Sequence, residues 1–235
     1  FTNFFTLDEC LSFKNVEEFN AQQSGGRIIK YDNNILLTVG DFRKRILAQD
    51  LKSNFGKILK IDTESMQNDI FTLGHRNPQG LFYDKSENII LSTEHGPNGG
   101  DEINLIKENN NYGWPISSYG KHYDGKFKKE APLYKSHKDY GFIEPLHYFN
   151  PSIGISEIIK FYNYNKNDQN YYLITSLKDK SLYIFKEENN FNKFTQVEKI
   201  NIEERIRDIV YYKLSNIYFM LLENSPSIAI FNEVD

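Results

Sequence analysis

The sequence predicts an all-β protein of the β-propeller type, with about four blades present in this chain. Three observations support the prediction. A hairpin followed by a third strand recurs along the chain, and these units begin about 45 residues apart on average when the segment between residues 112 and 150 is set aside. Long loops follow the second strands, and the polar motifs lie in those loops. A β-sandwich, which also joins many short strands, is the alternative, and these features favour the propeller.

The strands are predicted from β-rich runs that flank turn-forming residues. The first hairpin turns at Asp32–Asn34, the second at Asp84–Asn88 and the last at Lys213–Asn216. The runs are Arg27–Tyr31, Ile35–Val39, Gln79–Tyr83, Ile89–Thr93, Tyr171–Thr175, Ser181–Phe185, Asp208–Tyr212, Ile217–Leu221 and Ser227–Phe231. A few helical turns are expected only within Thr6–Glu18. We therefore expect residues 1–235 to form a single, partial propeller domain with a long inter-blade insertion at residues 112–150.

The composition excludes several classes of protein. Of the 235 residues, 39% are hydrophobic and 26% charged, which is ordinary for a globular domain with a sizeable core. The 18 Phe and 16 Tyr need burial, which excludes intrinsic disorder. The net charge of -4 argues against a nucleic-acid partner. No run approaches the roughly 20 apolar residues of a membrane span, and Cys10, the only cysteine, leaves no intrachain disulfide.

Two loops carry residues with clear chemical potential. In Gly74–Gly80, Arg76 offers a rigid fork of donors and Asn77 a donor and an acceptor; a structural turn with an ion-paired Arg is the alternative. In Ser92–Asn104, the Gly96 and Pro97 carbonyls and the carboxylates of Asp101 and Glu102 are oxygen ligands of the kind that Ca²⁺ prefers. A solvated acidic loop is the alternative there.

Further cations precede or begin the later blades. Strand alternation sends Arg205 and Arg207 to the same side, which is unfavourable unless an anion lies between them. Lys178 enters a loop at the equivalent point of the preceding blade. Loop cations from different blades converge on the mouth of a propeller channel, so together they suit a ligand with several carboxylates or carbonyls. Asn109–Pro115, which holds the only Trp, is either a packing corner or one wall of a ligand pocket.

Taken together, these motifs resemble those of the soluble quinoprotein glucose dehydrogenases, also called glucose/sorbosone or aldose sugar dehydrogenases. The matches are collinear from about residue 25 to residue 231 and include Gly25-Gly-Arg27, Val39-Gly-Asp41, Ala48–Leu51, Gly56–Leu59, Arg76–Gly80, Glu94–Glu102, Asn111–Pro115, Asn150–Ile153, Ser176–Lys178 and Arg205–Asp208. The resemblance implies a six-bladed β-propeller that binds pyrroloquinoline quinone (PQQ) and Ca²⁺. About two blades would then be missing at the N-terminal side, and the start at Phe1 fits a cut end.

The resemblance also implies the cofactor contacts. Arg76 and Asn77 match the pair that hydrogen-bonds the quinone carbonyls, with Arg76 stabilising negative charge on the reduced ring. Ser152 matches a hydroxyl residue that lines the cofactor. The cations that neutralise the cofactor carboxylates are matched by Lys178, Arg205 and Arg207.

Metal and catalytic positions follow in the same way. Gly96 and Pro97 match the backbone carbonyls that hold the quinone-bound calcium, a Lewis acid on the reactive carbonyl. Glu102 and the Tyr112 carbonyl match a second, structural calcium site of some members. Asp41 matches the carboxylate that orients the catalytic base.

The base itself departs from the family pattern. The family has His-x-Gly-Gly-Arg, and this chain has Gln23-Ser-Gly-Gly-Arg27. Glutamine does not titrate and cannot act as a general base near neutral pH. His75 and His95 lie close to the motifs, but family members carry histidines at those places beside their catalytic histidine, which argues against a replacement.

Three functions remain open at this point. The first is a PQQ- and Ca²⁺-dependent oxidoreductase that oxidises a sugar or alcohol hydroxyl by hydride transfer to the quinone and passes electrons to a separate acceptor. The second is a non-catalytic propeller that binds a ligand or partner, a decayed dehydrogenase, and Gln23 motivates it. The third is a calcium-dependent, lactonase-like hydrolase, which has no need of three converging cations. The resemblance implies a periplasmic or extracellular location.

Overall fold

The computed structural model describes residues 2–10, 22–123, 136–162, 164 and 169–232. Most of the helix expected within Thr6–Glu18 falls at residues 11–18, outside these described residues, and residues 6–10 form no helix. The described part of the chain has no helix that is both long and apolar enough to cross a membrane.

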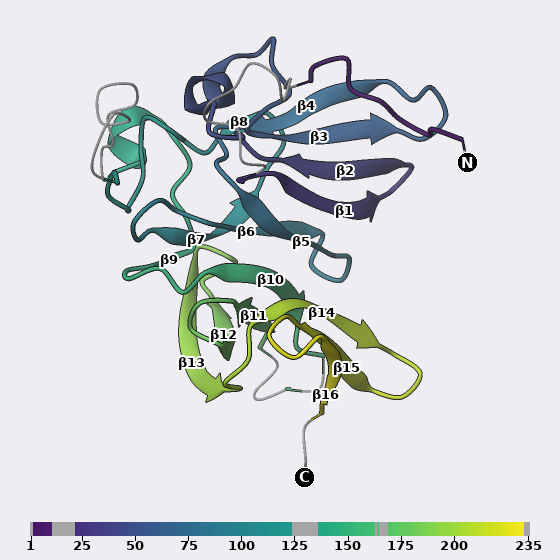
Figure 1. The fold of residues 1–235 in the computed structure, drawn as a ribbon, viewed down its shortest axis with the longest axis vertical. Coiled ribbons are helices and arrows are strands. Elements are labelled where there is room, and N and C mark those ends of the chain that lie inside the picture. The colour runs from purple at the N-terminus through teal and green to yellow at the C-terminus, as the bar shows by residue number, and fades with distance from the viewer. Residues whose placement is uncertain (1, 11–21, 124–135, 163, 165–168, 233–235) are drawn as a thin grey trace.

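Four sheets follow one another along the described chain, and the strands of each are nearly consecutive in sequence (Figure 1). The first sheet contains β1 (Gly25–Tyr31), β2 (Asn34–Val39), β3 (Lys57–Asp62), β4 (Asn68–Leu73) and the short β8 (Asn110–Asn111). The second contains β5 (Pro78–Asp84), β6 (Ile89–Glu94), β7 (Asp101–Ile106) and β9 (His147–Phe149). The third contains β10 (Ile155–Lys160), β11 (Tyr171–Ser176), β12 (Ser181–Glu188) and β13 (Lys193–Asn201). The fourth contains β14 (Ile206–Tyr212), β15 (Ile217–Leu222) and β16 (Ser227–Phe231).

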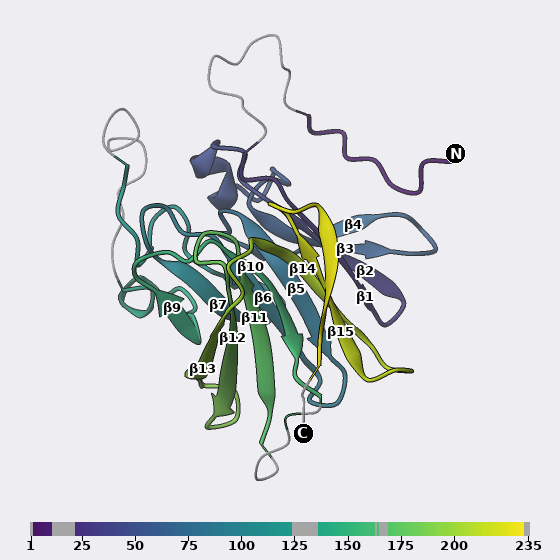
Figure 2. The same ribbon diagram turned by 60° about the horizontal axis from the view of Figure 1, so that its bottom comes forward.

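These sheets are the blades of a propeller. Each is an antiparallel meander, apart from β8, which pairs parallel to β4. The first strands of the four sheets pack in order, β1 against β5, β5 against β10 and β10 against β14, and the remaining strands fan outward (Figure 2). Two short 3₁₀ helices, η2 (Arg45–Gln49) and η4 (Lys138–Tyr140), lie in connections between strands.

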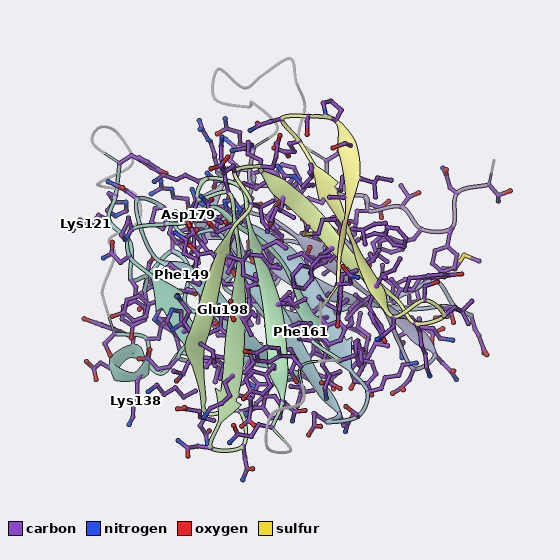
Figure 3. All side chains as sticks on the ribbon, turned by 90° about the horizontal axis from the view of Figure 1, so that it is seen from below. Lys121, Lys138, Phe149, Phe161, Asp179 and Glu198 are labelled. Atoms are coloured by element: carbon purple, nitrogen blue, oxygen red, sulfur yellow. The ribbon has the colours of Figure 1, made fainter. Side chains whose placement is uncertain are left out.

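The core lies between the blades because most strands are apolar on both faces. In β11, Tyr171 and Leu173 pack toward the fourth sheet, whereas Tyr172 and Ile174 pack toward the second. The two aromatic residues labelled in Figure 3, Phe149 and Phe161, belong to these two separate clusters. Alternate side chains of one strand thus join successive sheets into a stack.

The predicted propeller and every predicted strand pair are confirmed, and the structure adds strands that the sequence analysis did not predict. The expected polar loop at Ser92–Asn104 is in fact the end of β6, a turn and the start of β7. Asp101 is buried there because its carboxylate accepts the backbone N–H groups of Gly96, Gly154 and Ile155. Within the expected insertion at residues 112–150, β9 forms the outer strand of the second sheet.

Candidate functional site

A cavity of about 750 Å³ opens at the end of the molecule where the loops preceding the inner strands gather. Lys121 and Asp179, labelled in Figure 3, lie toward this end. The predicted site residues that line the cavity are Gln23, Arg76, Asn77, Gly96, Pro97, Ser152, Lys178, Arg205 and Arg207. All four sheets contribute to it through the loops before β1, β5, β10 and β14. The convergence expected of the loop cations is therefore present in the fold.

Arg76 is a rigid cation in the cavity wall. The residue is 6% exposed, and its Nη1 donates to the His95 carbonyl at 2.9 Å. Its guanidinium carbon lies 5.4 Å from the ring centre of Trp114, which is within the range of a cation–π contact. Burial lowers the pKa of Arg76, and the nearby Asp41 carboxylate opposes that shift. A guanidinium retains its charge under such a shift, so the wall carries a fixed positive charge.

The anion expected between Arg205 and Arg207 is a side chain of the chain itself. Arg205 Nε lies 2.7 Å from Glu223 Oε2, and Arg207 Nε lies 2.5 Å from Glu223 Oε1. Burial raises the pKa of Glu223, but the hydrogen bonds from the two arginines outweigh it and the pKa is lowered. Two cations therefore share one carboxylate, which leaves a net positive charge at this side of the cavity.

Lys178 and Ser152 lie on the side contributed by the third sheet. The Lys178 amide donates to the Ile153 carbonyl at 3.0 Å, which fixes the turn after β11. No ion-pair partner for the Lys178 ammonium is found among the described residues. The Ser152 hydroxyl is buried and has no hydrogen-bond partner in the described part of the chain. An orphaned hydroxyl in a cavity wall is a contact that a ligand can satisfy.

Gln23, at the position where the resemblance implies a catalytic histidine, lines the cavity. Its backbone is left-handed, with φ of 62°, and its carbonyl accepts the Phe42 N–H at 3.1 Å. Gly40 packs so closely that a Cβ there would lie 1.9 Å from the Gln23 carbonyl oxygen. The backbone is therefore held at this point, whereas the side chain carries no titratable group.

Asp41 is buried behind the cavity rather than in its lining. Its Oδ2 accepts the Trp114 Nε1–H at 2.7 Å, and its Oδ1 accepts the Arg43 N–H at 2.9 Å. Burial raises the pKa of Asp41 to about 6, and the charge of Arg76 opposes the shift. Asp41 therefore holds the Trp114 indole in place, and Arg76 stacks on that indole. The predicted task of Asp41, orientation of a base, stays a prediction.

Glu102 and Tyr112 line a second, small chamber of about 10 Å³, which shares Arg76, His95 and Gly96 with the cavity. Glu94 also lines the chamber, and burial, followed by the charge of Glu94, raises the pKa of Glu102 well above its ordinary value. The chamber is large enough for one water molecule or ion. A cation there would relieve the repulsion between the two carboxylates.

The histidines differ in how their ring nitrogens are used. His75 is fully buried, with Nδ1 2.9 Å from Glu94 Oε2 and Nε2 2.8 Å from Thr72 Oγ1, so both nitrogens are occupied. His95 lines the cavity, its Nε2 has no partner among the described residues, and burial lowers its pKa. These contacts make His75 a structural residue.

The Gly96–Pro97 turn offers backbone oxygens rather than side-chain ligands. A Cβ on Gly96 would lie 2.2 Å from the Gly100 carbonyl oxygen, so only glycine fits. The hydroxyl of Tyr123, which lines the same cavity, donates to the Pro97 carbonyl at 3.0 Å and places that oxygen on the cavity side. No group of three or more His, Cys, Asp or Glu side chains that could hold a metal occurs among the described residues.

Sequence reasoning missed residues whose importance depends on tertiary partners. Glu223 pairs two predicted arginines, and Gln79 contacts both Asn77 and Arg207. Gln79 lies within the Arg76–Gly80 motif, so its position in a conspicuous turn was the one available signal. Glu223 comes directly after β15 and lies in no motif, so the sequence offered no signal for it.

Comparison with known proteins places this geometry in a family. A family model described as glucose/sorbosone dehydrogenase matches residues 8–229. The aldose sugar dehydrogenase YliI of Escherichia coli is 32% identical over 204 residues, covering 79% of this chain and 53% of that protein. Quinoprotein glucose dehydrogenase B of Acinetobacter calcoaceticus is 36% identical over 123 residues, covering 40% of this chain and 26% of that protein.

Solved structures agree in fold. The apo-form crystal structure of the soluble aldose sugar dehydrogenase of Escherichia coli superposes with a TM-score of 0.75 at 28% identity, covering 88% of this chain and 62% of that one. The chain spans about half the length of the curated sugar dehydrogenase from Escherichia coli that it matches.

Proposed function

The chain belongs to the glucose/sorbosone dehydrogenase family, and from this premise we propose that its protein is a PQQ- and Ca²⁺-dependent oxidoreductase acting on a sugar or a related alcohol. The observation that carries the proposal is the cavity shared by Arg76, Lys178, Arg205 and Arg207, which come from three separate blades. One relative is named a quinoprotein and another an aldose sugar dehydrogenase, which supports the same cofactor and substrate class.

The residues present fit a quinone that carries several carboxylates. A cavity of about 750 Å³ lies within the range of small-molecule sites. Its cations would neutralise carboxylates, and the buried Ser152 hydroxyl lacks a partner that such a ligand can supply. PQQ, when bound, supplies the electron-accepting carbonyl for hydride transfer.

The chain's own residues would bind and orient both partners. Arg76 is held by the Trp114 ring and the His95 carbonyl, so its charge needs no rearrangement to stabilise negative charge on a reduced ring. Asn77 would donate to a carbonyl of the cofactor. Loops of all four sheets contribute residues to the cavity, so the binding groups come from separate parts of the chain.

The Gly96 and Pro97 carbonyls would hold the quinone-bound Ca²⁺, together with oxygens of the cofactor. The position of the Pro97 oxygen on the cavity side fits this role, and hard oxygen donors suit Ca²⁺. The metal would contribute as a Lewis acid. A second Ca²⁺ in the Glu102 chamber would be structural.

A second candidate function, a non-catalytic binding module, is favoured by Gln23 alone. Proton removal by a placed base contributes about 10²–10⁴-fold to catalysis, and Gln23 cannot provide it. A calcium-dependent hydrolase ranks below both. The cavity's carboxylate, Asp101, is already engaged by three backbone N–H groups, and the remaining charges are cationic.

Lys178 provides the test of cofactor binding. Lys178→Met is expected to weaken PQQ affinity by about tenfold or more, because a hydrogen bond to a charged group contributes about 1.5–3 kcal/mol. Fluorescence titration of the protein with PQQ measures it. Lys213→Met, an exposed lysine in the turn between β14 and β15, is the matched control and should bind as the wild type does. Failure of the wild type to bind PQQ would refute the proposal. If the wild type binds PQQ, an assay of dye reduction with a panel of sugars distinguishes a dehydrogenase from a binding module.

The structural Ca²⁺ makes a separate prediction about stability. Calcium at about 100 times its Kd should raise the free energy of unfolding by about 2.7 kcal/mol, and EDTA should reverse this. Glu102→Gln is expected to abolish the response while remaining at least as stable as the wild type in EDTA, because a buried repulsive carboxylate is removed. Glu198→Gln, on the exposed face of β13, serves as control. An unchanged calcium response in Glu102→Gln would remove Glu102 from the site.

We propose, from the family resemblance, that the protein works in the periplasm or outside the cell. Fractionation of cells that express the full-length gene tests this, and recovery of the protein only with cytosolic markers would contradict it.

A further inference from the structure

A chain of hydrogen bonds runs through the lining of the cavity from the fourth sheet to the first. Arg207 Nη1 donates to Gln79 Oε1 at 2.9 Å. Gln79 Nε2 donates to Asn77 Oδ1 at 2.9 Å, and the Gly25 backbone N–H donates to the same oxygen at 3.2 Å. Three blades are thereby linked through the two amide side chains.

The two ends of this chain fix the direction of every bond in it. A guanidinium can only donate, so the Gln79 atom facing Arg207 must be its oxygen. Gln79 Nε2 then faces Asn77. A backbone N–H can also only donate, so the Asn77 atom that faces Gly25 is an oxygen as well. The donors at the two ends therefore determine which atom of each amide is oxygen and which is nitrogen, an assignment that is otherwise ambiguous for Asn and Gln.

The consequence concerns the remaining group of Asn77. Its oxygen already accepts two N–H groups, and no acceptor for its Nδ2 lies among the described residues. Asn77 lines the cavity, so its NH₂ group is the part presented to a ligand. Arg207 is held independently by Glu223, so loss of Gln79 would leave that arginine anchored.

We propose that Gln79 is a positioning residue that turns Asn77 into a dedicated hydrogen-bond donor, so that the site selects a ligand with an acceptor, such as a carbonyl oxygen, at this point. The proposal rests on the proposed function for the identity of the ligand as PQQ. The orientation itself rests only on the contacts within the chain. Gln79 acts through Asn77 and need not touch the ligand.

The orientation is tested first without any ligand. In isotope-labelled protein, a scalar coupling through the hydrogen bond from the Gly25 amide nitrogen to Asn77 Cγ is expected in the wild type. Gln79→Met and Gln79→Glu should both abolish or weaken it, because neither donates to Asn77 Oδ1. Gln79→Glu retains the acceptor for Arg207 and the length of the side chain, which keeps the test valid should Gln79→Met fold poorly.

The effect on binding is tested by a double-mutant cycle with PQQ. Gln79→Met should weaken the affinity for PQQ by about tenfold in the wild type and by less than about twofold in the Asn77→Leu background. Tyr172→Phe is the control, since it removes a buried inter-blade hydrogen bond to Asp84 at the opposite end of β5. It should leave both the coupling and the affinity unchanged.

Each result decides a different claim. Three results would overturn the inference. The first is absence of the coupling in the wild type, and the second is its persistence in both Gln79 variants. The third is that the losses of PQQ affinity caused by Gln79→Met and by Asn77→Leu are independent, so that the double variant shows their product. A wild type that shows the coupling and fails to bind PQQ would refute the proposed function and leave the oriented donor established.

Discussion

Replacing Gln23 with histidine is expected to raise the turnover of a sugar by about 10²-fold or more when PQQ and Ca²⁺ are bound, since a placed general base is typically worth 10²–10⁴-fold. The backbone is already prepared for the change. Residue 23 has a left-handed φ of 62°, a conformation that histidine adopts more readily than most residues. Its carbonyl is held by the Phe42 amide, and its side chain lies in the cavity.

The measurement is dye reduction at saturating sugar, with the pH varied from 5 to 9. A histidine base becomes active when it loses its proton, so the variant's kcat should rise with pH through roughly 6.5, a limb that the wild type lacks. Gln22→His is the matched control, because Gln22 also lines the cavity while its Oε1 accepts from Arg43. Gln22→His should leave turnover within about twofold of the wild type.

The outcome separates the two leading functions. A large gain confined to Gln23→His would identify a dehydrogenase site that lacks its base and retains the remaining machinery. No gain in a variant that binds PQQ would contradict the expectation and favour a binding module. A comparable gain in Gln22→His would show that the position of the imidazole is not decisive.

Much of the fold could be predicted because the hairpins carry their own local signals. β1 and β2 are β-rich runs around turn-forming residues, and both lie where the sequence placed them. β10 was missed because it carries Ser156 and Glu157 in its interior, and these residues make sense only beside Thr175 and Arg27. β13 was missed because its exposed face is charged and its pairing depends on β12.

For the candidate site, too, local features could be predicted from the sequence and contacts between distant segments could not. Its lining was predictable because the motifs lie in loops that a propeller collects at one end. The partners that orient the lining were not, because their assignment needs contacts between distant segments. Arg207 and Glu223 are 16 residues apart, and Arg207 and Gln79 are 128 apart. An anion was expected between Arg205 and Arg207, and in the structure that anion is the Glu223 carboxylate of the same chain.

Arg27→Met is expected to lower the free energy of unfolding by about 1.4 kcal/mol more at pH 9 than at pH 6, because Glu157 loses the cation that lets it ionise near pH 8 and one pH unit corresponds to about 1.36 kcal/mol. Arg27 Nη2 lies 2.6 Å from Glu157 Oε2, and Nη1 lies 2.8 Å from Asp208 Oδ2. These contacts join β1 to β10 and β14, the first strands of three different sheets. Equilibrium unfolding of both proteins in urea at pH 6 and at pH 9 measures the loss. The double variant Arg27→Met/Glu157→Gln should recover much of it, because no buried charge is left unpaired.

The pH dependence of this loss identifies its cause. Burial raises the pKa of Glu157 to about 8, and the charge of Arg27 opposes the shift. A carboxyl whose pKa is raised on folding makes the wild type less stable as pH rises from about 4.5 to about 8. Without Arg27 the pKa of Glu157 rises further, so the deficit of Arg27→Met should be small near pH 6, where Glu157 is protonated in both proteins, and should grow as pH passes 8. A deficit of the same size at pH 6 and pH 9 would instead assign the role of Arg27 to packing and to Asp208, because the neutral and ionised forms of Glu157 would then depend on it equally.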